Sequence, residues 1–145
     1  MTKKASEFVN DLKQALTSFR IELLLPEDER NKLESLKDSD RDVTELSSIT
    51  LDRMAAAFMQ SLETASNLVD DTTLAATSCV EAAGYAYRDD VADRIKTGRK
   101  DLALRPLSRE YVKRKGNARI GYLGGALYRS IANCEVRVAK RGSNS

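Results

Sequence analysis

The sequence predicts a mainly α fold: a helical body over residues 1–98 and a basic, loop-rich C-terminal arm over residues 99–145, forming one domain overall. Through the body, apolar residues recur every three or four positions, which is the spacing of one helix face. Past residue 98 the chain holds glycines, a proline and many positive charges, with too few periodic apolar residues for a long buried element. We therefore expect the arm to form short helices and at most one short strand.

The first helix is expected over residues 6–24. Its apolar stripe consists of Phe8, Leu12, Leu16, Phe19 and Leu23. Pro26 should end this helix, because proline lacks a backbone donor and clashes with the preceding turn. The acidic run Glu27-Asp28-Glu29 then favours a second short helix, since the N-terminal end of a helix dipole attracts negative charge.

Residues 36–50 are polar and rich in turn formers, so we expect an exposed loop that serves as a linker. A third helix follows over residues 50–69. Its near-heptad apolar stripe consists of Leu51, Met54, Phe58, Leu62, Ala65 and Val69. This helix should bury one face in the core.

A fourth helix is expected to start at an N-cap within Asp70-Asp71-Thr72 and to end at Gly98. Its apolar stripe consists of Ala76, Val80, Ala83, Tyr87, Val91 and Ile95. Small residues on this helix allow close approach of another helix, from the same or a neighbouring copy. They are Ala75, Ala76, Ala82, Ala83, Gly84 and Ala86.

The arm contains three short predicted elements. Residues 108–114 should form about two helical turns, with Ser108 as the N-cap and Tyr111 and Val112 as the apolar anchors. The Gly124-Gly125 pair predicts a turn with positive φ in at least one residue, leading into a short helix within residues 123–131. Residues 135–139 alternate as an edge strand does, and disorder is expected beyond Lys140.

Enzymatic chemistry is not expected. The chain has no histidine, and its two cysteines, Cys79 and Cys134, lack metal-ligand or redox spacing, so we expect free thiols, no metal and no cofactor. The pairs Asp70-Asp71 and Asp89-Asp90 are better explained as a helix cap and as a solvent-exposed helix face than as catalytic carboxylates. Residues 121–127 lack the phosphate-loop pattern. We therefore predict no catalytic residues and no small-molecule substrate.

No apolar run is long enough for a membrane span, and Met1-Thr2-Lys3-Lys4 does not lead into a signal-peptide core. We therefore expect a protein made in the cytoplasm without membrane contact.

Charge is distributed unevenly along the chain. Residues 1–90 carry 10 Lys/Arg against 18 Asp/Glu, a net −8, whereas residues 91–145 carry 14 against 4, a net +10. This asymmetry is consistent with a basic arm that meets nucleic acid, with an acidic face docking on the basic face of the next copy, or with two solvated surfaces.

The candidate contact residues lie in the arm. They are Lys113, Arg114, Lys115, Arg119, Tyr111 and Tyr122. Cations interleaved with aromatic rings are suited to gripping phosphates and stacking bases. The competing interpretation is that these cations pair with the acidic side chains of residues 27–42 on an adjacent subunit. We expect protein contact to be the main role, with DNA as the alternative target.

The segment Pro106-Leu107-Ser108-Arg109-Glu110-Tyr111-Val112-Lys113-Arg114-Lys115-Gly116, followed by Gly121-Tyr122-Leu123-Gly124-Gly125-Ala126-Leu127-Tyr128-Arg129-Ser130-Ile131, resembles tailed-bacteriophage virion-morphogenesis and tail-completion proteins. The similarity covers roughly residues 84–131, and Gly124-Gly125 stands where that family has Thr-Gly. The resemblance implies a viral structural protein of the virion, a neck, head-to-tail connector or tail-completion subunit. It also implies a homo-oligomeric ring that contacts other neck, portal-adaptor or tail proteins. The alternative is a small helical nucleic-acid-binding protein that uses the basic arm.

Overall fold

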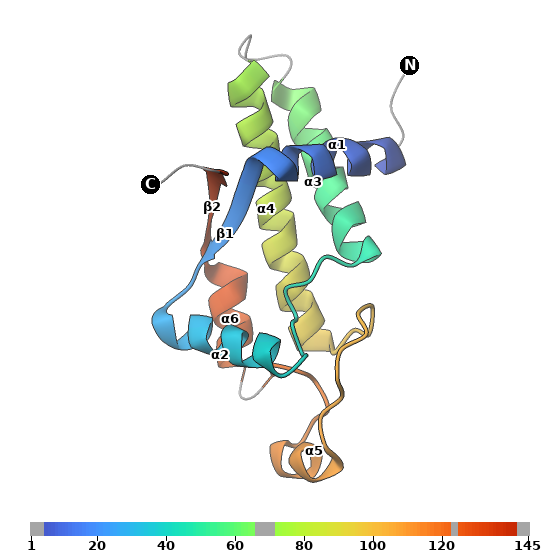
Figure 1. The fold of residues 1–145 in the computed structure, drawn as a ribbon, viewed down its shortest axis with the longest axis vertical. Coiled ribbons are helices and arrows are strands. Elements are labelled where there is room, and N and C mark those ends of the chain that lie inside the picture. The colour runs from blue at the N-terminus through green and yellow to red at the C-terminus, as the bar shows by residue number, and fades with distance from the viewer. Residues whose placement is uncertain (1–4, 66–71, 123–124, 142–145) are drawn as a thin grey trace. The chain divides into compact units, whose positions relative to one another are not determined.

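The structure, a computed structural model, describes residues 5–65, 72–122 and 125–141. Within these ranges the chain forms six helices and one two-stranded sheet, which confirms the mainly α fold (Figure 1). The elements are α1 (Ala5–Ser18), β1 (Phe19–Leu24), α2 (Glu27–Asp38), α3 (Ser48–Ala65), α4 (Thr72–Thr97), α5 (Arg109–Lys115), α6 (Ala126–Asn133) and β2 (Glu135–Lys140).

The chain divides into two compact units, and each combines early and late parts of the sequence. The first unit comprises residues 1–24, 48–87 and 136–145, and the second comprises residues 25–47 and 88–135. This division differs from the predicted boundary between residues 98 and 99. The end of the arm pairs with β1, whereas its earlier part folds with α2 and the last turns of α4.

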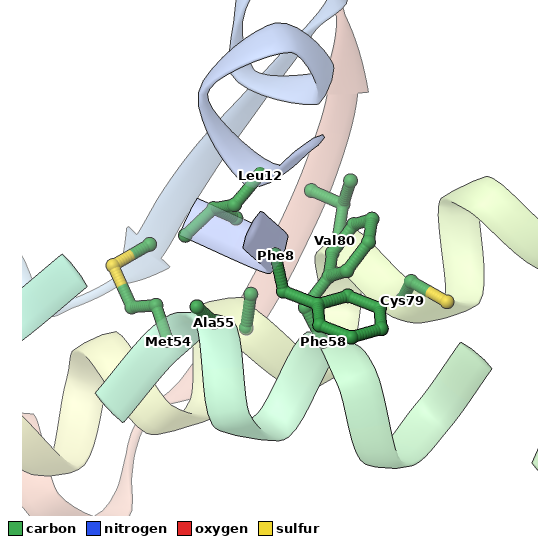
Figure 2. Packing of buried hydrophobic residues seen from close by; sticks show 8 residues of the cluster. Phe8, Leu12, Met54, Ala55, Phe58, Cys79 and Val80 are labelled. Carbon is green, nitrogen blue, oxygen red and sulfur yellow. The ribbon is translucent and has the colours of Figure 1, made fainter. Parts of the chain in front are cut away.

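The first unit has an apolar core between α1, α3 and the first part of α4. Its buried side chains are Phe8, Leu12, Met54, Ala55, Phe58, Cys79, Val80 and Ala83. Figure 2 shows Phe8 and Leu12 meeting the side chains of α3 and α4. The predicted stripes on these three helices supply most of this core, which confirms their helical register.

Residues 19–24 form strand β1, so the prediction that the first helix continues to residue 24 is wrong. The Phe19–Leu23 spacing of four suits a helix stripe, but Phe19, Ile21 and Leu23 also alternate with Arg20 and Glu22, as the residues of a strand do. Phe19 and Ile21 pack against the core of the first unit. Pairing with β2 decides between the two structures, because the strand gains a ladder partner that a longer helix would lack.

The two strands are antiparallel. The Arg141 backbone N–H donates to the Ser18 carbonyl at 2.8 Å, and the Arg137 guanidinium pairs with the Glu22 carboxylate, so late residues of β2 meet early residues of β1. The pKa of Glu22 is lowered, chiefly by its hydrogen bond with Arg137. Disorder was predicted beyond Lys140, but the Arg141 backbone is held by its hydrogen bond to Ser18. Residues 142–145, the rest of that predicted disordered tail, lie outside the described residues.

Gly84 allows the sheet to lie close to α4. A Cβ at this position would be 2.6 Å from Val136 Cγ1 and 3.2 Å from Ile21 Cγ2. The small-residue face of α4 was predicted to pack against another helix, but at Gly84 it packs against the two strands. Ala83 on the same helix belongs to the helical core.

The second unit has its own buried apolar side chains. They are Leu25, Val43, Val91, Ala92, Ile95, Leu127, Ile131 and Cys134. Helix α2 confirms the helix predicted after Pro26, but it runs to Asp38, so the loop is shorter than predicted and covers residues 39–47. The prediction that this loop is exposed is wrong at Val43 and Ser47, which are buried. Cys79 and Cys134 are not joined by a disulfide, as predicted, and burial raises the pKa of the Cys79 thiol.

The remaining boundaries agree closely with prediction. Helix α3 begins at Ser48 and is described to Ala65, so its predicted end and the Asp70-Asp71 cap lie outside the described residues. Helix α4 ends before Gly98, whose φ is +67°. The predicted Ser108 cap is confirmed, because its Oγ accepts a 3.2 Å hydrogen bond from the Tyr111 N–H. The predicted strand near the C-terminus is β2.

Candidate functional site

Helix α5 carries four of the six predicted contact residues. Like α2, it is one of the least buried helices of the second unit. None of its residues is buried, and Tyr111 is 39% exposed. Ser108 caps its start and Gly116, with φ of +89°, caps its end. Isolated helices shorter than about 12 residues are marginal in water, so seven residues need support beyond their own hydrogen bonds.

Part of that support comes from the segment that leads into α5. The Arg41 guanidinium donates to two consecutive carbonyls, from Nε to Arg105 O at 2.9 Å and from Nη2 to Pro106 O at 3.0 Å. The Arg105 N–H in turn donates to Asp40 O at 3.1 Å. The start of α5 is therefore fixed to the chain just after α2.

A groove of about 710 Å³ lies between α2 and the α5 region. Its lining residues are Asp28, Asn31, Lys32, Ser35, Leu36, Ser39, Arg41, Leu107, Ser108, Tyr111, Arg114, Lys115, Gly121 and Leu127. We call this the α2–α5 groove. Its lining combines leucines and a tyrosine with four cations and a single carboxylate, so it offers both apolar contact and positive charge.

The structure separates the six predicted contact residues into two groups. Tyr111, Arg114 and Lys115 line the α2–α5 groove, whereas Lys113 lies exposed on α5 outside the lining. Arg119 and Tyr122 belong to the following turn and contact each other, with the guanidinium 3.7 Å from the ring centroid.

Arg119 is used within the second unit. Its Nη1 donates a 2.6 Å hydrogen bond to the Lys96 carbonyl in the last turn of α4. A cation at this position pairs with a carbonyl that has no partner within the helix, and it stabilises the negative end of the helix dipole. Its backbone carbonyl accepts a hydrogen bond from Lys115 Nζ. Arg119 and Tyr122 therefore brace the turn, which reduces what they offer to a partner.

The four groove cations have no carboxylate partner among the described residues. Arg41 donates to carbonyls, as above, and Arg114 lies 5.8 Å from the Tyr111 ring centroid, with Lys115 at 5.6 Å from it. The pKa of Lys115 is lowered by burial and by the charge of Arg119. Within the described chain, Asp28, the carboxylate in the lining, thus forms no ion pair with any of these cations.

The predicted turn before α6 is confirmed at Gly125, which has φ of +78° and occupies the N-cap. A Cβ there would lie 2.9 Å from Arg129 Nη1 and 3.3 Å from Tyr122 Oη. Gly124 and Leu123 lie outside the described residues. The turn therefore positions α6, whose Leu127 closes one side of the groove.

A buried cluster of charges near the end of α4 was missed by the sequence analysis. Asp89 is exposed as predicted, but the expectation that Asp90 shares the solvent face is wrong, because Asp90 is 1% exposed. Arg99 Nη2 lies 2.9 Å from Asp90 Oδ2, and Arg94 Nη2 lies 3.5 Å from the same oxygen. The Asp90–Arg94 spacing of four residues was the available signal.

Asp101 joins the same cluster. Its carboxylate lies 3.1 Å from Arg94 Nη2 and accepts a hydrogen bond from Ser47 Oγ. Arg99 Nε lies 3.0 Å from Asp101 Oδ1 without hydrogen-bond alignment, while Nη2 donates to Oδ2 at 3.1 Å. Burial alone would raise the pKa of Asp101, but the bonds from Arg99, Arg94 and Ser47 hold that pKa well below its usual range.

The cluster fastens two loops to α4. Arg94 Nη1 also donates to Val43 O at 2.5 Å and to Glu45 O at 3.0 Å, which secures residues 43–47. Burial would lower the pKa of Arg99, yet its bonds to Asp101 and Asp90 raise it, so the guanidinium stays charged. With every acid opposed by a guanidinium, this arrangement suits a structural clamp.

Folding also redistributes the charge asymmetry. The first unit contains 8 Lys/Arg against 8 Asp/Glu, and the second contains 16 against 14. The acidic residues that follow Pro26 and the basic residues of the arm up to residue 135 thus belong to one unit. The net −8 and +10 of the linear sequence do not correspond to two oppositely charged bodies.

No group of His, Cys, Asp or Glu side chains suited to holding a metal ion occurs in the described part of the chain. No helix across residues 5–65, 72–122 and 125–141 has the length and apolar character needed to cross a membrane. Comparisons of the chain with family models, with curated proteins and with solved structures give no match.

Proposed function

We propose that this chain is a structural virion protein of a tailed phage or phage-like particle, a neck, head-to-tail connector or tail-completion subunit that assembles as a homo-oligomeric ring. The observation that supports this most is the structure of the segment around residues 109–115, which carries the resemblance to the phage family. It forms an N-capped, basic helix, α5, that is fixed at its entry by Arg41 yet buries none of its own residues. A helix presented in this way suits contact with a neighbouring subunit.

Helix α2 supports the same proposal. It also has no buried residue, and its first turn carries Glu27, Asp28 and Glu29. A basic helix and an acidic helix on one chain permit a head-to-tail contact between copies, and such heterologous contacts close into rings when the rotation allows. Charge complementarity would then set register and association rate more than affinity.

The test is the mass of the purified protein in solution by light scattering, followed by negative-stain imaging. We expect rings that dissociate when Lys113, Arg114 and Lys115 are all changed to Glu, with the far-UV circular dichroism unchanged. The matched control reverses three exposed cations outside both α5 and α2, Lys13, Lys100 and Lys140. Normal assembly of the α5 triple variant, or a wild type that stays monomeric at high concentration and is recruited by no phage neck or tail protein, would contradict the proposal.

The alternative function, nucleic-acid binding by the basic arm, is favoured by one observation. Arg114, Lys115 and the exposed Tyr111 place positive charge beside an aromatic ring, the combination that binds phosphate and base together. Tight binding of duplex DNA at physiological salt, with a steep loss of affinity as salt rises, together with normal assembly of the triple variant, would favour this function over the connector.

A further inference from the structure

We propose that the α2–α5 groove binds a short acidic peptide segment of a partner protein, one that inserts apolar side chains between its carboxylates. This inference goes beyond assembly of the ring, because it concerns a separate ligand and rests on the lining of the groove alone. The groove volume of about 710 Å³ admits a few side chains.

The charge of the lining selects an anionic ligand. Lys32, Arg41, Arg114 and Lys115 face one carboxylate, Asp28. Arg41 and Lys115 donate to backbone carbonyls, which leaves their charge without a counter-ion among the described residues. A partner carboxylate would supply that counter-charge in a partly desolvated setting, where charge-assisted hydrogen bonds are strong.

The apolar part of the lining selects a peptide over a nucleic acid. Leu36 and Leu107 offer half-buried aliphatic surface, and the buried Leu127 completes the apolar part of the lining. A sugar-phosphate backbone does not bury such surface. Tyr111 is the only ring in the lining, so the groove lacks the row of aromatic platforms on which successive bases stack. An acidic segment with Leu, Ile or Phe side chains satisfies both halves of the lining, as in groove recognition of amphipathic segments.

The walls of the groove are fixed before any ligand binds. Arg41 holds the segment that leads into α5. Gly121 lets the side chains of Leu36, Leu127 and Ile95 pack against the backbone of the turn, because a Cβ at this position would lie 3.3 Å from Leu36 Cδ1. A preformed groove costs the ligand less ordering free energy than one that must assemble on binding.

The experiment is selection of a random display library of peptides of about 12 residues on the immobilised full chain, followed by fluorescence anisotropy with the enriched peptides. We expect enrichment of Asp and Glu interspersed with Leu, Ile or Phe. Lys32→Glu and Arg114→Glu should each weaken binding about tenfold or more, because each places a like charge beside the ligand. Leu107→Asn should weaken binding as well, through loss of apolar contact.

Matched controls lie on the same elements outside the lining. Lys37→Glu on α2 and Lys113→Glu on α5 change exposed residues, and Leu104→Asn before α5 changes a leucine that is half-buried, like Leu107, but outside the lining. All three should keep the affinity within about twofold. No acidic enrichment, or enriched peptides that bind the Lys32 and Arg114 variants normally, would overturn the proposal. Displacement of the peptide by oligothymidylate at lower concentration than by unlabelled peptide would assign the groove to nucleic acid instead, and displacement by excess unlabelled protein would assign it to a second copy.

Failure of this inference is distinguishable from failure of the connector function. Rings that form from a wild type that binds no peptide would overturn the groove proposal alone. A monomeric wild type that binds acidic peptides with the expected variant pattern would overturn ring assembly alone.

Discussion

The two units use the same helix, α4, in different ways. In the first unit α4 contributes Cys79, Val80 and Ala83 to an interior that is almost entirely apolar. In the second unit its last turns contribute Asp90 and Arg94, a buried ion pair, beside apolar residues. Apolar packing is tolerant of how its members are arranged, whereas buried charges require each partner to be in place. The second unit is thereby committed to one loop arrangement, and it is also the unit that carries the candidate groove.

The largest expected effect tests the apolar interior. Phe58→Asp should destabilise the protein by about 4 kcal/mol or more, because Phe58 is buried between α1, α3 and α4 and an unpaired carboxylate would enter that core. Urea denaturation followed by circular dichroism measures the change. Gln60→Asp on the exposed face of α3 is the control and should have little effect. An unchanged midpoint for the Phe58 variant would mean that the assigned α3 register is wrong.

The next effect tests the charged interior. Arg94→Ala should cost about 3 kcal/mol, because Asp90 and Asp101 would stay buried with one guanidinium fewer. Arg137→Ala in the sheet of the first unit breaks the more exposed pair with Glu22 and should cost less than about 1 kcal/mol. Equal losses for the two variants would remove the contrast between the units. Both values come from denaturant unfolding at neutral pH.

The contrast between the units also explains which parts of the fold could be predicted from the sequence. Apolar periodicity reports burial of one helix face, so the stripes through Leu12, Phe58 and Val80 were found. Periodicity cannot distinguish Phe19 and Leu23 on a helix from the same residues on a strand, because a spacing of four places both on one face in either structure. The deciding partner, β2, lies more than a hundred residues away. The local signal was ambiguous and the tertiary contact resolved it.

The buried charge cluster illustrates a second limit. Charged residues are normally exposed, so Asp90 was assigned to solvent, whereas its burial is made favourable by two guanidinium groups, that of Arg94 one turn later and that of Arg99 after the turn at Gly98. For the candidate site, composition located α5 and its cations correctly. It did not reveal that Arg119 would be used to cap α4, or that α2 would supply the other wall of the groove.

Acidification should destabilise the second unit more than the first. The folded-state pKa of Asp101 lies below its unfolded value of about 3.9. Its contribution to stability is therefore complete above that unfolded value and is lost as pH falls through the folded value, an effect on the order of 2 kcal/mol. Unfolding free energies measured from pH 7 down to pH 2 should fall at the acid end.

Asp101→Asn should be less stable than wild type at pH 7 but should lose less on acidification, because it lacks the titrating group. Glu22→Gln in the first unit also removes a carboxyl whose pKa is lowered, by Arg137, but the pair is more exposed, so its acid profile should stay closer to wild type. If Glu22→Gln flattens the profile more than Asp101→Asn does, acid sensitivity does not arise from the buried cluster.

The smallest expected effect concerns the place where the sheet of the first unit approaches α4. Gly84→Ala would ordinarily stabilise a helix by up to about 1 kcal/mol through propensity. Here the new Cβ would lie 2.6 Å from Val136 Cγ1, and a β-branched side chain has little freedom to turn away. Overpacking costs about 1–3 kcal/mol, so we expect a net loss of about 1 kcal/mol in the unfolding free energy.

A double-mutant cycle separates the clash from the propensity gain. With Val136→Ala in place, the Cγ1 atom that obstructs the new Cβ is gone, and Ile21 Cγ2 at 3.2 Å needs to give by only a few tenths of an ångström. Gly84→Ala should then change from destabilising to neutral or stabilising, because helix propensity no longer competes with overpacking. If Gly84→Ala costs the same in both backgrounds, the sheet does not approach α4 at this residue. A neutral or stabilising Gly84→Ala with Val136→Ala in place would show that the apolar interior of the first unit accepts added volume once room is made. The paired charges of the second unit, by contrast, tolerate no loss of a partner.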